Sequence, residues 1–152
     1  MSFSVKIRAD GFEKRRLVTG PIWLQIDDQA FPEEDWSDFP VIVLGWWLSN
    51  ITPLITNQAL RCECLFMDGP LRFNITKLGR DRWEIAFIRN TLDGDVCWFK
   101  GEIDPKTLID GILSAAEAVI DLCKQKEWES SDLVTLERET AAVKRLIKSL
   151  PE

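Results

Sequence analysis

The most constraining feature of the sequence is a series of runs, between residues 60 and 103, in which apolar and polar residues alternate. Alternation with a period of two is typical of strands that bury one face. The breaks between the runs are short and rich in Asp, Gly, Asn and Pro, which favours tight connections between antiparallel neighbours. The sequence therefore predicts an antiparallel meander with strands at 60–67, 71–78, 82–89 and 95–103.

Further strands are predicted at the amino terminus. Apolar side chains alternate from Phe3 to Ala9, and the run ends at a turn signal, Asp10-Gly11. The alternation resumes at Ile22, Leu24 and Ile26 after the interruption by Gly20-Pro21. These runs are expected to pair at an edge, which gives an antiparallel sheet of five or six strands in all. A sheet buried on one side needs helices to cover it.

Two covering helices are predicted after the meander. Asp104 can cap the first, Pro105 can take its first helical position, and an apolar stripe runs on to Cys123. Residues 130–132 offer a second cap, after which apolar residues recur at steps of three and four from Leu133 to Leu150. Both patterns are those of helices that bury one face.

A third helix is predicted between the two groups of strands. Ser37 or Asp38 could cap it, Pro40 fits its first turn, and residues 41–51 are apolar nearly all round. A buried strand ending at Gly45 is the alternative, and Pro53 should end or kink whichever element precedes it. We therefore expect a single α+β domain over residues 1–152, with the meander sheet covered by a central helix and two carboxy-terminal helices.

Composition excludes several function classes. The chain has no histidine, which excludes Ser-His-Asp and Cys-His nucleophile systems and histidine metal sites. Nineteen basic and 25 acidic residues give a net charge of -6, which argues against direct binding of nucleic acid. No phosphate-cradling glycine motif is present.

The amino terminus and the cysteines indicate a cytoplasmic protein. The first ten residues lack the pattern of a signal peptide, and the longest apolar stretch, 39–48, covers about half of the roughly 20 residues that span a bilayer. We expect no membrane association. The cysteines, Cys62, Cys64, Cys97 and Cys123, lack the spacing of paired zinc knuckles, so we expect buried, reduced thiols, with no metal and no cofactor.

The acidic segment, residues 27–38, is the main candidate for a functional site. It has no basic residue and carries two aromatic rings, Phe31 and Trp36, among its carboxylates: Asp27, Asp28, Glu33, Glu34, Asp35 and Asp38. One interpretation is a solvated loop whose acids favour the start of the next helix. The other is a surface for a basic protein partner, in which charge speeds the encounter and the rings anchor the contact.

Three further interpretations compete with the acidic segment. Asp68, Asp93 and Asp95 could converge as the acid and base of a hydrolase acting on a sugar, although Asp-Gly pairs are also ordinary turn chemistry. The seam from Leu133 to Leu150 could serve self-association if it were exposed. Trp46-Trp47 could offer an aromatic platform, but core packing with one ring inward is the commoner use.

Several short pieces of the chain resemble a pattern in small bacterial proteins, some of which resemble immunity proteins of polymorphic toxin systems. The pieces cover about a third of the chain and are Ile22-Trp23-Leu24-Gln25-Ile26-Asp27, Phe31-Pro32, Trp36-Ser37-Asp38-Phe39, Trp46-Trp47 and Phe66-Met67-Asp68-Gly69-Pro70. The resemblance implies a cytoplasmic protein that binds and neutralises a toxin without catalysis of its own. It transfers no site residue, so the choice of the acidic segment depends on charge and aromatic content alone.

Overall fold

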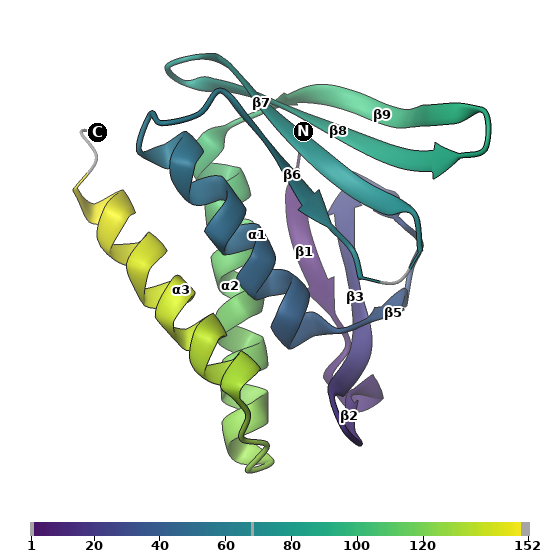
Figure 1. Cartoon of the computed structure of the whole chain (residues 1–152), viewed down its shortest axis with the longest axis vertical. Helices are drawn as coiled ribbons and strands as arrows, with labels where there is room; N and C mark the ends of the chain where they lie inside the picture. The colour runs from purple at the N-terminus through teal and green to yellow at the C-terminus, as the bar shows by residue number, and fades with distance from the viewer. Residues whose placement is uncertain (1, 68, 150–152) are drawn as a thin grey trace.

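The computed structural model of the chain, in which residues 2–67 and 69–149 are described, contains two antiparallel sheets and three α-helices (Figure 1). The first sheet has five strands, in which β3 (Val18–Ile26) pairs with every other member. Its partners are β1 (Phe3–Ile7), β2 (Glu13–Lys14), β4 (Gln29–Phe31) and β5 (Ser37–Asp38), and a short 3-10 turn (Ala9–Gly11) follows β1.

The second sheet is the predicted meander. Its four strands lie in the order β6 (Arg61–Leu65), β7 (Leu71–Gly79), β8 (Arg82–Thr91) and β9 (Gly94–Ile103). Phe73, Ile75 and Ile85 are buried on the inner face, as the alternation predicts. The α+β class is confirmed, and the finer arrangement differs from the expected single sheet because the strands divide into two.

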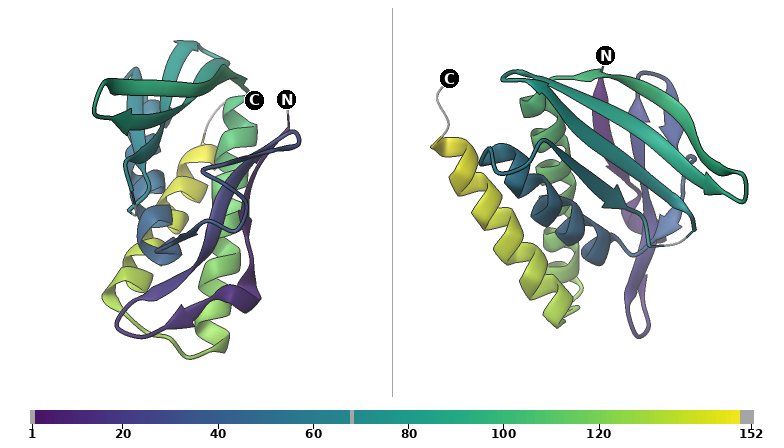
Figure 2. Two further views of the ribbon diagram at one scale, coloured as in Figure 1. Left: turned by 90° about the vertical axis from the view of Figure 1, so that its right-hand side faces the viewer. Right: turned by 45° about the horizontal axis from the view of Figure 1, so that its top comes forward.

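The helices are α1 (Pro40–Ile55), α2 (Pro105–Gln125) and α3 (Ser131–Lys148). As Figure 1 shows, α1 lies between α3 and the strands, and α2 lies behind it. The α1 helix packs against α2, α3, β3 and β6, and α2 also packs against β1. Buried residues from both sheets and all three helices form one hydrophobic core. Two views of this layering are given in Figure 2.

The position of α1 closes one edge of the second sheet. Trp47 donates its indole N–H to the Leu65 carbonyl at 2.7 Å, and Asn50 donates its amide to the Glu63 carbonyl at 2.9 Å. Both carbonyls belong to β6, so side chains of α1 occupy the edge at which a further strand could have joined. Helix packing therefore keeps any further strand from joining the sheet at β6.

Most predicted helix signals are confirmed. Asp104 accepts the N–H of Thr107 at 3.0 Å and caps α2, and Ser130 accepts the N–H of Leu133 at 3.1 Å and caps α3. Residues 41–51 are helical, which rules out the alternative of a strand ending at Gly45. The predicted cap of α1 is wrong, because Phe39 takes the N-cap position.

The α1 helix does not end at Pro53, where the sequence predicts an end or a kink. It continues for two residues, to Ile55.

The apolar seam of α3 is buried. Leu133, Leu136 and Val143 lie in the core, and α3 packs on α1 and α2. Leu150 lies outside the described residues. The interpretation of α3 as a self-association helix therefore loses the exposed seam that it requires.

No helix in the described part of the chain combines the length and the apolar character needed to cross a membrane.

Candidate functional site

The acidic segment is more structured than a solvated loop. After a turn at Asp27-Asp28 it contains β4 and β5, which both pair with β3, so that Phe31 lies opposite Leu24 and Asp38 lies opposite Gly20. The stretch between the two strands holds Glu33 and Glu34, whose side chains are exposed. The fold therefore holds both ends of the segment and presents its middle to solvent.

Asp27 and Asp35 bind residues that flank β1. Asp27 accepts the backbone N–H of Ser2 at 3.0 Å, and this hydrogen bond lowers the pKa of the Asp27 carboxyl. Asp35 pairs with Arg8 at 2.8 Å, and the same contact raises the pKa of the guanidinium. These two carboxylates hold the acidic segment against the residues that flank β1, and both already have a partner within the molecule.

Asp38 is buried, with 2% of its surface exposed. Its Oδ1 accepts the backbone N–H of Phe39 at 2.8 Å and that of Met67 at 3.2 Å, and its Oδ2 accepts the indole N–H of Trp36 at 3.0 Å. This carboxylate joins the end of the acidic segment, the start of α1 and the segment after β6. It acts as a structural group and presents no surface to a partner.

Phe31 also belongs to the core, with only 4% of its surface exposed. Its ring stacks on Phe87 at 4.5 Å between centroids and on Trp98 at 5.5 Å. The expectation that Phe31 anchors a partner is not met in this conformation, because β4 pairing turns the ring inward onto the second sheet. Trp36 is partly covered and is fixed by its bond to Asp38.

The ring that does lie at the surface beside the acidic segment is Trp98, which is 49% exposed. In the ladder between β8 and β9, Phe87 pairs with Phe99 and Ile88 pairs with Cys97, so Trp98 is an extra residue at a β-bulge. A bulge disturbs the alternation of side chains, and here both Trp98 and Phe99 contact Phe87. Sequence periodicity does not reveal a bulge, which is why Trp98 was not among the predicted site residues.

These positions define one candidate binding surface. It consists of the exposed carboxylates of Asp28, Glu33 and Glu34 together with the half-exposed ring of Trp98, and we call it the acid–tryptophan surface. The stack of Phe31 against Trp98 brings the two parts together, since the three acids lie within three residues of Phe31. Exposed Val96 and Leu92 extend the apolar part along the end of the β8–β9 hairpin.

The alternative carboxylate site is not assembled among the described residues. Asp68 lies outside them, Asp93 is exposed, and Asp95 pairs with Arg72 at 2.7 Å on the outer face of the second sheet. Arg72 is also bonded to Asn90 and lies 3.9 Å from Glu63. Asp95 is therefore held in a cluster of side chains around Arg72 and does not meet Asp93 in a shared pocket among the described residues.

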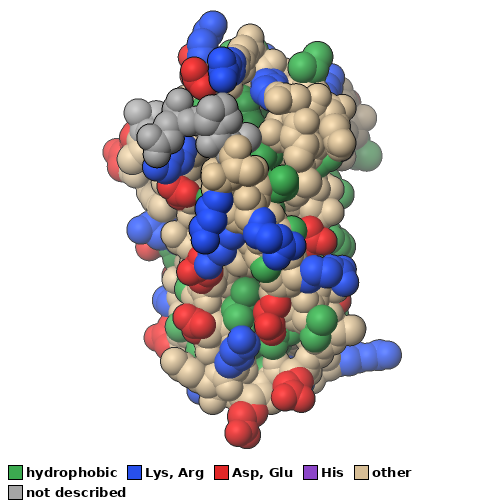
Figure 3. All heavy atoms as spheres, turned by 90° about the vertical axis from the view of Figure 1, so that its left-hand side faces the viewer, with side chains coloured by type: hydrophobic (Ala, Val, Ile, Leu, Met, Phe, Trp, Pro, Cys, Tyr) green, Lys and Arg blue, Asp and Glu red, His purple; other side chains and the backbone are tan. Residues whose placement is uncertain are grey.

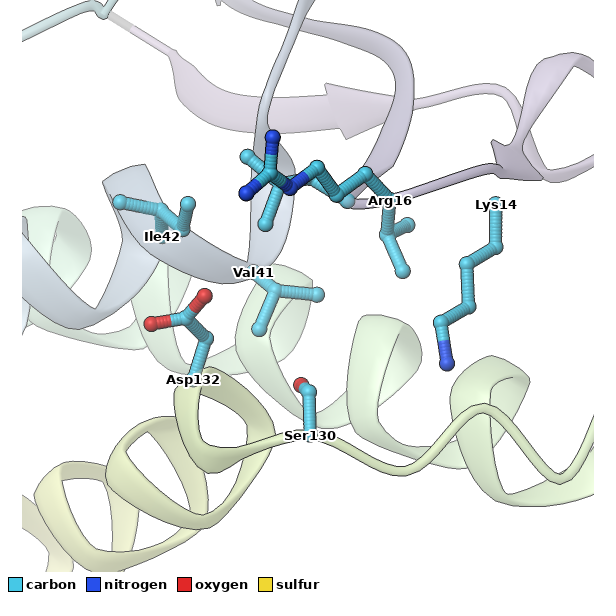
Figure 4. Close-up of a pocket in the computed structure, with 8 residues that line it drawn as sticks. Lys14, Arg16, Val41, Ile42, Ser130 and Asp132 are labelled. Carbon is cyan, nitrogen blue, oxygen red and sulfur yellow. The ribbon is translucent and has the colours of Figure 1, made fainter.

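The small pocket drawn in Figure 4 lies elsewhere, between the β2–β3 region and the starts of α1 and α3. It has a volume of about 20 Å³, room for about one water molecule, and its lining includes Arg16, Val41 and Asp132. The pocket contains none of the predicted site residues. On the face that α3 occupies, the described Lys and Arg side chains are interspersed with Asp and Glu (Figure 3).

The cysteine thiols are free and differ in their surroundings. Cys62 and Cys64 share the inner face of β6, where the hydrogen bond with the Cys64 thiol lowers the pKa of Cys62, and burial raises the pKa of Cys64. Burial also raises the pKa of Cys123. The expectation of uniformly buried thiols is wrong for Cys97, which is exposed on β9. No group of three potential metal ligands occurs within residues 2–67 and 69–149.

We expect Cys97 to react with Ellman's reagent at least about tenfold faster than the buried Cys64 and Cys123, because reaction needs an accessible thiolate. The measurement is the time course of thiol modification of the native protein. The Cys97→Ser variant should lose the fast phase, and a Cys123→Ser variant should keep it. A fast phase whose amplitude is the same in Cys97→Ser as in the wild type would contradict the exposure of this thiol, since the partly buried Cys62 is the other thiol that could react early.

Comparison of the chain with protein-family models, with curated proteins and with solved structures finds no match.

Proposed function

We propose that this chain is a non-enzymatic protein-binding module, similar in role to an immunity protein, that acts in the cytoplasm. In this role it covers a basic cleft of a partner protein, such as a toxin, with the acid–tryptophan surface. The observation that carries the proposal is the position of Trp98, which is half exposed beside three exposed carboxylates while Phe31 and Phe87 support its ring from below.

The two parts of the surface would act at different stages of binding. Carboxylates that stay exposed attract a basic partner over a distance comparable to the Debye length, about 8–10 Å at physiological salt, and so accelerate encounter. A large ring at the centre of a contact contributes most of the binding free energy once water is excluded. Because Trp98 is held by its stack, little side-chain freedom is lost on binding.

The experiment is an affinity capture from the native host at low salt, comparing the wild type with the triple variant Asp28→Lys, Glu33→Lys, Glu34→Lys. We expect a captured partner whose yield falls at least about tenfold in the variant, because reversing exposed charges removes the attraction and adds repulsion. The Trp98→Ala variant should lower the yield comparably, because it removes the anchoring ring.

The matched control is Asp110→Lys, Asp121→Lys, Glu129→Lys, which reverses three exposed acids on and after α2. Each acid-to-lysine change adds two charges, so both triple variants move the formal net charge from -6 to about zero. A partner that is lost equally from both variants responds to net charge and not to this surface. Capture that depends on neither triple variant nor on Trp98 would contradict the proposal.

A further inference from the structure

The two edges of the second sheet are treated differently by the rest of the molecule. At β6, the carbonyls of Leu65 and Glu63 are occupied by the side chains of Trp47 and Asn50 from α1. At the opposite edge, β9 pairs with β8 and with no other strand in the described part of the chain. In the right-hand view of Figure 2, β9 forms the free margin of the sheet.

The free edge is exposed and rich in apolar side chains near the hairpin. All residues from Gly94 to Trp98 are exposed, and Leu92, Val96 and Trp98 are among the large apolar side chains that meet solvent. An edge strand carries a row of unpaired N–H and C=O groups that can pair with another extended chain. The bulge at Trp98 divides β9, so that its straight hairpin-side part, residues 94–97, adjoins the acid–tryptophan surface.

Charge distinguishes between the possible occupants of this edge. A second copy pairing through its own β9 would bring two sets of Asp28, Glu33 and Glu34 toward the same junction, because these acids lie next to Phe31, whose ring contacts Trp98. Each copy carries a net charge of -6, which makes such pairing repulsive. An extended segment bearing Lys and Arg would instead meet complementary charge.

We infer that the β9 edge takes up an extended, basic segment of the partner protein as an additional strand of the second sheet. The inference rests on the proposed function and specifies how the partner is held. Backbone hydrogen bonds to β9 would supply a general affinity, Trp98 would pack on the apolar side chains of the added strand, and the carboxylates would select its basic residues. The segment would lie beside residues 94–98 and remain remote from β6.

The test uses the full chain and a short blocked peptide of alternating Lys and Val as the probe, followed by amide NMR at low salt. We expect shift changes at the amides of residues 94–98, and little change at 61–65. Two control peptides separate the contributions: one has Glu in place of Lys, and the other keeps Lys but has every backbone N–H methylated. Each should bind at least about tenfold more weakly than the probe, since one loses the charge match and the other the strand pairing.

Several results would overturn the inference. Equal binding of the methylated peptide would show recognition of charge without strand addition, and equal binding of the Glu peptide would remove the charge argument. Concentration-dependent shifts at 94–98 without peptide would show that a second copy occupies the edge. Failure of the probe to bind would overturn strand addition, whereas the proposed function fails separately, only if capture ignores the acid–tryptophan surface.

Discussion

Replacing Trp47 with alanine is expected to lower the free energy of unfolding by about 3–5 kcal/mol, the range for deletion of a fully buried large aromatic side chain. Trp47 is completely buried and makes edge-to-face contacts with Phe66 at 5.2 Å and Phe73 at 5.0 Å between ring centroids. Its loss also leaves the Leu65 carbonyl without its indole donor. The measurement is urea denaturation followed by circular dichroism.

The neighbouring ring supplies the control. Trp46 is 39% exposed, and Trp46→Ala is expected to cost clearly less than Trp47→Ala because part of its ring already meets solvent and less apolar contact is lost. Similar losses in the two variants would contradict the assignment of Trp47 as the link between α1 and the second sheet. A smaller loss for Trp47 than for Trp46 would reverse the assigned orientation of α1.

Replacing Asp38 with alanine is expected to destabilise the protein by about 3 kcal/mol, because three donors lose an acceptor in a buried position. Those donors are the N–H groups of Phe39 and Met67 and the indole of Trp36. Chemical denaturation measures the loss. Hydrogen exchange should also show faster exchange at residues 32–37, since the bond that holds Trp36 is removed.

Asp28→Ala is the matched control, because the same type of side chain is exposed on the same segment. Its effect on the free energy of unfolding should stay within about 0.5 kcal/mol. If Asp38→Ala lowered the free energy of unfolding no more than Asp28→Ala does, the structural role assigned to Asp38 would be wrong.

The elements that sequence could predict are those whose signals are local. Alternation and turn residues set the limits of the meander, and Asp104 and Ser130 cap the helices at the expected positions. The orientation of Trp46 and Trp47 follows from their adjacency on a buried helix, which turns one ring inward and leaves the other partly covered. Each of these features depends on a few neighbouring residues.

The features that sequence could not supply depend on contacts between distant segments. Trp47 and Asn50 occupy the β6 edge of the second sheet, and no pattern within residues 61–65 indicates these contacts. The burial of Phe31 depends on Phe87, and the exposure of Trp98 depends on a register shift between β8 and β9. The acidic character of the site was visible in the sequence, whereas the identity of its ring was not.

We propose that this chain works by recognising a partner through a surface that contains Glu33 and Trp98. The most direct test is site-specific photo-cross-linking in the native host, with a photoreactive amino acid placed at Glu33 in one variant and at Asp121, on the exposed side of α2, in another. We expect a discrete cross-linked protein from position 33 and none from position 121. A cross-linked partner at position 121 with none at position 33 would contradict it.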